Sequence, residues 1–376
     1  MEFIDLKRQY SRLKTEIDSN VQKVMAESRF IGGAEVSELE EKLAQYVGRK
    51  YCITCGSGTD ALLLAYMSYG IGQGDAVFCT DMTFIASVEP ACLLGATPVF
   101  VDIDLNTYNM EPEKLEEAIL RVKAEGRLMP KAVVAVDFLG VPVEFDKISE
   151  ICSRYGLVLI EDAAQAMGAK YKGKMCGSFG DIACTSFFPS KPLGCYGDGG
   201  AVFTDDETIR KLITSIKVHG KGKTKYDNIR QGINSRLDTI QAVVLLAKLN
   251  VLEEEIVKRQ GVAKRYAESL TNYIKVPFVP EYCRSAFAQF VLLAENEKQK
   301  NAIVEHLKKN NIPSISYYPK EMDKMDVFEK DGTYDYLNAK LYAECNLGIP
   351  FSPYITDEEQ DEVINAIKSF YDKPAI

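Results

Sequence analysis

A lysine between two prolines is the first residue in this sequence whose setting suggests chemistry. Lys191 lies between Pro189 and Pro192, and the segment separates two short apolar runs. Because the residue before a proline avoids the helical region, Lys191 is expected in a fixed, irregular turn. A lysine amine whose pKa is lowered in a dry pocket attacks carbonyl groups. An exposed lysine in a glycine-rich loop would have the same local sequence, and the stretch alone favours neither interpretation.

A carboxylate at the end of an apolar run is the second candidate. Asp162 follows the nearly continuous apolar run 157–161, and Gln165 comes three residues later. A buried carboxylate is costly unless a cation lies beside it. The protonated ring nitrogen of pyridoxal phosphate (PLP) is such a cation, and PLP enzymes pair it with a carboxylate. Alone, Asp162 is better interpreted as a helix N-cap, but beside Lys191 the cofactor role is favoured.

A glycine turn supplies a place for a phosphate. Gly56 and Gly58 flank Ser57, and Thr59 and Asp60 are expected to cap a helix. The free amides at such a helix start bind anions, above all phosphate. A capped turn without a ligand fits equally well, and the spacing differs from the dinucleotide-binding fingerprint. Ser186, five residues before Lys191, is a further candidate donor to a phosphate.

Alternating strands and helices must bring these side chains together. Near-continuous apolar strands separated by helices predict an α/β fold with a mostly parallel sheet covered on both faces. Ligands of such sheets gather at the carboxyl ends of the strands, which is where Thr59, Phe84, Asp162 and Gln165 fall. A helix is expected to open at Phe84. The predicted strands cover residues 51–54, 76–80, 98–103, 133–138, 157–161, 183–188 and 201–204.

The length of 376 residues favours two domains. We expect a large PLP-binding domain over residues 1–252 and a smaller α+β domain over 253–376. In the smaller domain, strands are expected near 288–293 and at 314–318, with helices at 298–309, 336–344 and 357–371.

The composition argues against several classes of protein. The 45 basic and 54 acidic residues give a net charge of −9, which disfavours a nucleic-acid or membrane surface. The N-terminus lacks a signal layout, so we expect a cytoplasmic protein. Cys52, Cys79, Cys92, Cys152 and Cys184 lie singly in apolar runs and are expected to be buried and reduced. With two histidines and one close cysteine pair, no metal site is expected.

Five short motifs lie along the chain: GTDA at 58–61, EDAAQ at 161–165, SFFPSK at 186–191, GDGG at 197–200 and NSRLD at 234–238. Together they resemble the DegT-type nucleotide-sugar aminotransferases, and the likeness runs from the first helix to the last. The resemblance implies the type I (aspartate aminotransferase) PLP fold and a homodimer whose active sites lie at the subunit interface.

Carried over position by position, the resemblance assigns cofactor roles. Lys191 would form the Schiff base, and Asp162 would pair with the pyridine nitrogen. Gln165 would contact the ring hydroxyl, and Phe84 would stack on the ring. The phosphate would be held by Gly58, Thr59, Ser186 and, from the other subunit, Asn234.

The resemblance also bears on the substrate. Some relatives have histidine in place of the lysine and act as dehydratases, so Lys191 favours transamination. The lysine stretch is most similar to the subgroup that aminates UDP-2-acetamido-2-deoxy-3-oxo-glucuronate, in which Arg236 would face the sugar carboxylate. Tyr317 and Tyr318 would lie near the sugar. They stand with Pro319 where relatives usually have His-Tyr-Pro, which is a departure from the family pattern.

These features imply a PLP-dependent aminotransferase acting on a nucleotide-linked keto sugar, with glutamate as amino donor. The expected pathway is cell-surface polysaccharide biosynthesis, such as that of O-antigen. Alternatives are amination of a neutral dTDP- or UDP-linked 3- or 4-keto deoxy sugar, or a PLP-dependent sugar dehydratase. A third is a regulatory or binding protein that kept the fold and lost catalysis.

Overall fold

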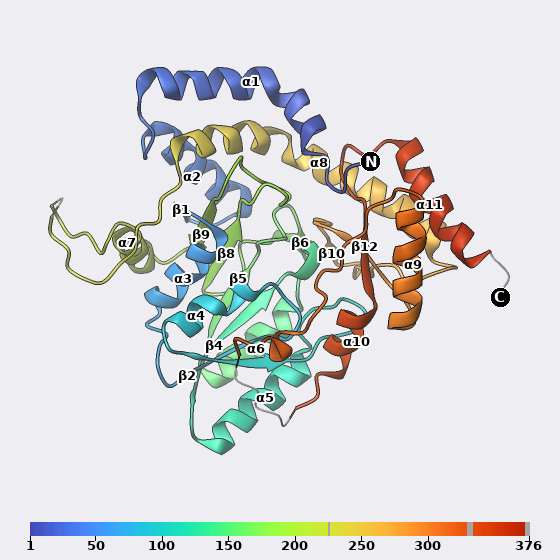
Figure 1. The fold of residues 1–376 in the computed structure, drawn as a ribbon. Helices are drawn as coiled ribbons and strands as arrows, with labels where there is room; N and C mark the ends of the chain where they lie inside the picture. The colour runs from blue at the N-terminus through green and yellow to red at the C-terminus, as the bar shows by residue number, and fades with distance from the viewer. Residues whose placement is uncertain (225, 329–333, 373–376) are drawn as a thin grey trace.

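A seven-stranded sheet forms the centre of the computed structural model, which describes residues 1–224, 226–328 and 334–372 (Figure 1). The five strands β8, β5, β4, β2 and β3 run parallel, and β9 and β1 are antiparallel to their neighbours. This confirms the predicted mostly parallel sheet. In spatial order the strands are β1 (Tyr51–Cys55), β9 (Gly200–Thr204), β8 (Ile182–Ser186), β5 (Val158–Asp162), β4 (Met129–Val136), β2 (Asp75–Thr80) and β3 (Thr97–Val101).

Both faces of this sheet are covered, which is why its strands are apolar without alternation. Along β4, Val133 and Ala135 join one core cluster, whereas Val134 and Val136 join the other. The first cluster takes in α2 (Ala34–Val47), α5 (Pro112–Glu125), α6 (Phe145–Tyr155) and the first part of α8 (Thr239–Leu270). The second takes in α3 (Gly58–Ser68), α4 (Glu89–Leu93), α7 (Glu207–Ile216) and α10 (Leu337–Cys345).

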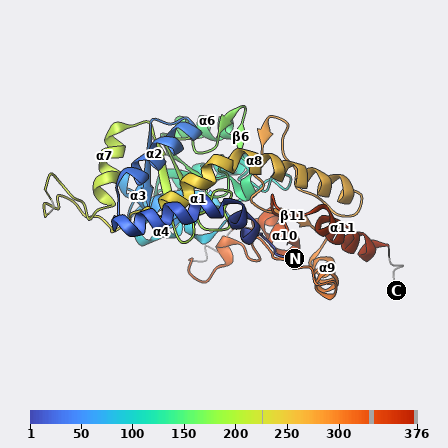
Figure 2. The same ribbon diagram turned by 90° about the horizontal axis from the view of Figure 1, so that it is seen from above.

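The long helix α8 runs along the whole molecule and lies beside the N-terminal helix α1 (Leu6–Glu27), as Figures 1 and 2 show. Leu13 and Ile17 of α1 pack on Val244 and Ala247 of α8. The predicted domain boundary after residue 252 falls inside this continuous helix. It stays a prediction.

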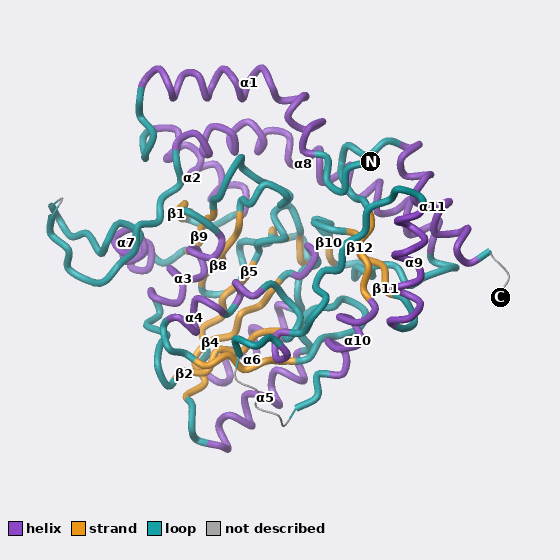
Figure 3. The backbone as a smooth tube through the Cα atoms, in the orientation of Figure 1, coloured by secondary structure: helices purple, strands orange, loops and turns teal. Residues whose placement is uncertain are grey.

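The helices α9 (Glu297–Lys309) and α11 (Asp357–Tyr371) lie at one end of α8, away from the large sheet (Figure 3). There β11 (Phe290–Leu293) pairs antiparallel with β12 (Asn346–Ile349), next to α9 and α11. The strand expected at 314–318 is wrong, because this segment forms only one isolated bridge, from Ile315 to Gly348. The strand that does pair, β12, follows α10 directly and was not predicted.

Short elements complete the fold. The helix expected to open at Phe84 is wrong: a single 3-10 turn, η1 (Ile85–Ser87), precedes the short α4, and Pro90 stands in the first turn of α4, where a longer helix would lose a backbone hydrogen bond. The remaining elements are β10 (Cys283–Arg284), β6 (Lys170–Tyr171), β7 (Lys174–Met175), η2 (Phe138–Gly140) and η3 (Met322–Lys324).

The loop between α7 and α8 projects from the body of the molecule (Figure 1). Among the described residues, no helix is long and apolar enough to cross a bilayer. All ten cysteines are free; four of the five predicted to be buried are buried, and Cys92 is partly exposed.

Candidate active site

Lys191 lies in the loop that follows β8, as the two prolines predict. The loop is closed on itself: the Phe187 amide donates to the Gly199 carbonyl at 2.7 Å, and the Cys195 amide donates to the Phe187 carbonyl at 2.7 Å. The Lys191 amide donates to the Phe188 carbonyl at 2.9 Å. These bonds hold the backbone of the lysine in one place without a helix or strand.

Asp162 and Lys191 form an electrostatic pair. Asp162 is 5% exposed, and burial raises the pKa of its carboxyl, although Ser87, Ala164 and Lys191 oppose that shift. The Ser87 hydroxyl donates to Oδ2 at 2.8 Å and the Ala164 amide to Oδ1 at 3.1 Å. Burial also lowers the pKa of the Lys191 amine, and the charge of Asp162 partly offsets this. A lysine with a lowered pKa has more of the neutral amine that attacks carbonyls.

The N-cap interpretation of Asp162 is wrong, because no helix follows it. Residues 164–168 form turns, and the chain then enters β6. The carboxylate is therefore a buried charge at the carboxyl end of a central strand, with two neutral donors and one lysine around it. Such a group is stable only when a cation pairs with it.

Gln165 is held in place by the turn after β4. Its Oε1 accepts from the Leu139 amide at 2.6 Å, and its Nε2 lies 3.5 Å from the Tyr318 hydroxyl. The Tyr318 ring lies 5.8 Å from the Phe84 ring, between centroids. Phe84 itself is 55% exposed, so one aromatic face is available for a ligand. Gln165, Phe84 and Tyr318 are thus brought together from three distant segments.

The glycine turn brings the start of α3 against β8. A Cβ on Gly58 would lie 2.6 Å from the Cβ of Ser186, so only glycine allows this approach. Ser57, and not Thr59 or Asp60, is the N-cap: its hydroxyl accepts from the Asp60 amide at 3.0 Å. Gly58 and Thr59 occupy the first turn, whose amides have no partner within the helix and can bind an anion.

The segment with Asn234 and Arg236 lies beside this turn in the same chain. Ser235 links the two: its hydroxyl accepts from the Gly56 amide at 2.9 Å and donates to Asp60 at 2.7 Å. Asn234 and Arg236 are exposed, and within the described part of the chain their side chains have no hydrogen bond or ion pair. Arg236 therefore does not pair with Asp238.

Asn346 fixes the two tyrosines expected near the sugar. Its side chain accepts from the Tyr317 amide at 2.7 Å and donates to the Tyr318 carbonyl at 2.9 Å. The Tyr342 hydroxyl donates to the Tyr317 carbonyl at 2.9 Å. The backbone of Tyr317 and Tyr318 is therefore held by hydrogen bonds to side chains, and not by the strand predicted at 314–318.

Sequence reasoning missed four residues that shape the site. Ser87 and Asn346 carry no motif, and their partners lie 75 and 28 residues away in sequence, so nothing local marks them. Ser57 could have been predicted as the N-cap of α3, because serine is a preferred residue directly before the first turn, where its hydroxyl accepts a backbone amide. Ser235 lies inside a motif that was recognised, but its contact with the glycine turn depends on the fold.

These residues fit PLP. The group needs a carboxylate for its ring nitrogen, an amine for its carbonyl and an anion site for its phosphate. Asp162, Lys191 and the first turn of α3 beside Ser186 supply these three in one region, at the carboxyl ends of β5 and β8 and after β1. Because residue 58 has no Cβ, it adds no side chain of its own between the start of α3 and Ser186.

A second buried carboxylate, Asp81, follows the end of β2 and contacts the segment after Tyr318. Burial and the charge of Asp323 raise the pKa of Asp81 to about 9. The Asp323 amide donates to Asp81 Oδ1 at 2.8 Å, and the Met322 amide donates to the Asp81 carbonyl at 2.9 Å. Glu321 and Lys324 also face this group. The contact ties the segment after Tyr318 to the end of β2.

We expect this contact to lose stability as the pH rises. Because the folded-state pKa is above the unfolded value of about 4, its contribution is complete below that value. It falls progressively until the pH passes about 9. Thermal unfolding from pH 6 to 9 should show this decline in the wild type, and a smaller decline in Asp81→Asn, which resembles the protonated acid. Equal slopes in both proteins would contradict the assignment.

Comparison with known proteins places this geometry in a family. The sequence profile of the DegT/DnrJ/EryC1/StrS aminotransferase family matches residues 11–368. The UDP-2-acetamido-2-deoxy-3-oxo-D-glucuronate aminotransferase of Pseudomonas aeruginosa is 44% identical over 94% of this chain and 96% of its own. The UDP-N-acetyl-3-dehydro-alpha-D-glucosamine 3-aminotransferase of Acidithiobacillus ferrooxidans is 35% identical over 97% and 96%.

Solved structures agree with the fold. A DegT/DnrJ/EryC1/StrS aminotransferase from Brucella abortus superposes with a TM-score of 0.96 at 44% identity, covering 99% of this chain and all of the other. NtdA of Bacillus subtilis, solved with the cofactor's amine form (PMP) bound, has a TM-score of 0.88 at 26% identity, over 99% and 83%. The chain thus has the type I fold and belongs to the DegT/DnrJ/EryC1/StrS family of PLP-dependent sugar aminotransferases.

Proposed function

We propose that this nucleotide-sugar aminotransferase transfers an amino group to the 3-keto carbon of a UDP-linked uronic acid. The observation that carries the proposal is the exposed Arg236 guanidinium, which has no partner among the described residues and lies beside the phosphate turn. A guanidinium binds a carboxylate through two parallel bonds. The 44% identical relative from Pseudomonas aeruginosa acts on a sugar that carries this carboxylate.

The chain's own residues would bind the cofactor and move the proton. PLP supplies an electron-withdrawing ring that stabilises negative charge developing at the amine carbon. Asp162 would hold the ring nitrogen protonated, and the first turn of α3 with Ser186 would bind the phosphate. The Lys191 amine would move a proton between the two carbons on either side of the transferred nitrogen, one from the substrate and one from the cofactor. Gln165 and Phe84 would orient the ring.

The amino donor is proposed to be glutamate, whose side-chain carboxylate would meet the same cationic groups as the sugar acid. Glutamate should convert the loaded enzyme to the amine form and change its visible absorbance. The proposed setting is cytoplasmic synthesis of a cell-surface polysaccharide. The runner-up substrate is a neutral keto sugar, which the 35% identical relative from Acidithiobacillus ferrooxidans acts on.

Loss of the Arg236 side chain should penalise the acidic sugar selectively. We expect Arg236→Ala to lower kcat/KM for the UDP-linked 3-keto uronate. The fall should correspond to about 2–5 kcal/mol of lost binding free energy, because a buried carboxylate loses its partner. The matching sugar with a neutral hydroxymethyl group should be almost unaffected. Single-turnover rates from the amine form of the enzyme measure both without interference from the donor.

The lysines of the projecting loop provide the control. Lys221 and Lys223 lie in this loop, and Lys225 falls outside the described residues. Lys223→Ala should leave the preference for the acid intact. If the loop lysines carry the selectivity, the role of Arg236 is wrong. A wild-type enzyme that prefers the neutral sugar would refute the uronate assignment and leave the aminotransferase assignment standing.

The active unit is proposed to be a homodimer in which Asn234 and Arg236 complete the partner's site. Both side chains are exposed, and both residues belong to the connection between α7 and α8, which projects from the body (Figure 1). Two-fold association is the commonest assembly of soluble chains. Exposed side chains that make no hydrogen bond or ion pair within the described part of their own chain are suited to such a role.

Mixing two inactive variants tests the shared site. Lys191→Ala and the Asn234→Ala/Arg236→Ala double variant should each be nearly inactive alone. After subunit exchange, half of the dimers are hybrids with one intact site, so about a quarter of the wild-type activity should return. Absence of recovery, with exchange proven by mass, would mean that each site is complete within one chain.

A further inference from the structure

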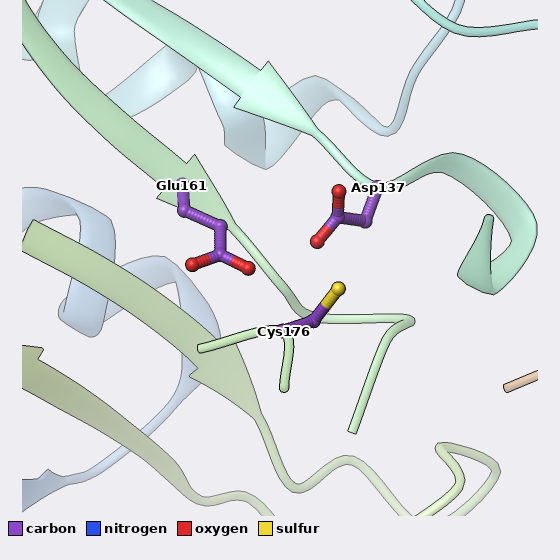
Figure 4. A group of neighbouring side chains, drawn as sticks. All are labelled: Asp137, Glu161 and Cys176. Atoms are coloured by element: carbon purple, nitrogen blue, oxygen red, sulfur yellow. The ribbon is translucent and has the colours of Figure 1, made fainter. Parts of the chain in front are cut away.

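Directly behind the cofactor site, two carboxyl groups and a thiol are buried together. Asp137 follows β4, Glu161 lies in β5 immediately before Asp162, and Cys176 follows β7; Figure 4 shows the three side chains turned toward one another. All three are completely buried, and one carboxylate oxygen of each acid and the Cys176 sulfur lie within 4.8 Å of one another. Two carboxylates cannot both be ionised there without a cation, so either a proton or a metal ion must be shared.

The hydrogen bonds show which carboxyl group has room for a proton. Both oxygens of Glu161 accept from backbone amides, Oε1 from Gly177 at 2.6 Å and Oε2 from Phe179 at 2.8 Å. In Asp137, Oδ1 accepts from the Val143 amide at 3.1 Å, whereas the buried Oδ2 has no donor among the described residues. An acid oxygen without a donor, next to a carboxylate, is the place for a proton.

The surrounding charges agree with this arrangement. Burial, together with the charge of Glu161, raises the pKa of Asp137 well above its ordinary range. Burial raises the pKa of Glu161 only to about 7, because the Gly177 and Phe179 amides favour its ionised form. Arg49 is the cation that acts on Glu161, and it also donates to the Phe179 carbonyl at 2.6 Å. Burial raises the pKa of the Cys176 thiol, so the thiol is neutral.

We propose that Asp137 keeps its proton at neutral pH and donates it to Glu161, and that this carboxyl pair positions Gln165 and Asp162 on the far side of the strand. Glu161 and Asp162 are consecutive in β5, so their side chains point to opposite faces of the sheet. The positioning part of the proposal rests on the roles of Gln165 and Asp162 at the cofactor.

Backbone contacts connect the pair to the site. The Asp137 amide donates to the Asp162 carbonyl at 3.1 Å. Asp137 also begins the turn Phe138–Gly140, in which Leu139 has a φ of +56° and donates its amide to Gln165 Oε1 at 2.6 Å. A left-handed leucine is strained and needs its surroundings to hold it. The bond from Asp137 to Glu161 anchors the start of that turn to β5.

A divalent metal ion is the alternative occupant of the cluster. It would need both carboxyl groups ionised and would gain most from a thiolate as third ligand. The neutral thiol and the two amides already bonded to Glu161 favour the proton. The two alternatives respond differently to neutral substitutions of the same shape.

Three variants separate these possibilities. Asp137→Asn can donate an N–H where the acid donates its proton, so it should keep a thermal midpoint and a cofactor affinity close to those of the wild type. Glu161→Gln turns an amide group toward the Gly177 or Phe179 N–H, and Asp137→Ala removes the donor. Both should bind PLP about tenfold or more weakly, because a buried polar group loses its partner. Asp146→Asn, on the exposed side of α6, is the control and should change nothing.

Two further measurements make the test specific. The pH dependence of the visible absorbance of bound cofactor should shift in Asp137→Ala and return to the wild-type position in Asp137→Asn, which a purely structural defect would not do. The infrared spectrum should contain a carbonyl band of a protonated carboxyl that disappears in Asp137→Asn, whereas the band of protonated Asp81 remains. Neither measurement uses a sugar, so an incorrect substrate assignment would not affect them.

The opposite pattern would overturn the proposal. If Glu161→Gln is tolerated and Asp137→Asn is not, the proton resides on Glu161. If both neutral variants fail and the purified protein holds one equivalent of metal that a chelator removes with loss of stability, the cluster is a metal site. If all three variants fold and their cofactor spectra match the wild type, the pair has no positioning role.

Discussion

Lys191→Ala should lose nearly all turnover. Among the described residues of the site, we expect the Lys191 amine both to bond the cofactor's carbonyl and to move a proton, and such proton transfer contributes about 10²–10⁴-fold by itself. Desolvation lowers the pKa of the amine although the charge of Asp162 opposes this shift, and a neutral amine suits both tasks. The rate of a complete transamination cycle, measured with saturating cofactor, is the test.

The position of the covalent bond provides an independent check. Borohydride reduction of the loaded wild-type enzyme, followed by peptide mapping, should place the cofactor on Lys191. Lys248 is the matched comparison, because it is buried, has its pKa lowered by burial to about 8, and donates to the Gly194 carbonyl of the same loop at 2.6 Å. A cofactor attached to Lys248, or to any other lysine, would refute the assignment.

Removing the charge of Asp162 should lower the turnover about as strongly as removing the Lys191 amine. We expect Asp162→Asn to lower turnover by roughly 10²–10⁴-fold, which corresponds to about 3–5 kcal/mol for one partner of a buried charge pair. Asparagine keeps the size of the side chain and can still bond Ser87 and the Ala164 amide. The loss would therefore come from the missing charge beside the ring nitrogen. Steady-state rates of Asp162→Asn and Asp162→Ala should agree within a few-fold.

The same substitution should not lower the thermal stability of the protein without cofactor, although it lowers the turnover. Burial raises the pKa of Asp162, so the folded apo-protein bears the cost of an ionised, buried carboxylate at neutral pH. Asp162→Asn removes that cost and should unfold at a temperature equal to or higher than that of the wild-type apo-protein. Near-normal turnover of Asp162→Asn would reduce the residue to a structural role, whatever its effect on stability.

The mostly parallel sheet and many of its strands could be predicted because their signals are local. Each central strand is a short apolar run ended by a polar or glycine residue, as at Asp162 and at Gly140 beyond β4. The strand expected at 314–318 failed because its polar and apolar residues alternate as in a strand, while its backbone is held instead by the side chains of Asn346 and Tyr342. The helix expected at Phe84 failed because Pro90 restricts the helix to a short piece after a 3-10 turn.

The sequence alone determined which residues can do the chemistry: a proline-flanked lysine, a carboxylate at a strand end and a glycine turn before a helix. These signals depend on near neighbours, so they can be read along the chain. Only the tertiary structure decided that Ser87 bonds Asp162, that Ser235 joins the arginine segment to the glycine turn, and that Asp137 faces Glu161. Those partners come from elements far apart in sequence, and a side chain's choice among distant partners follows from how the sheet and helices pack.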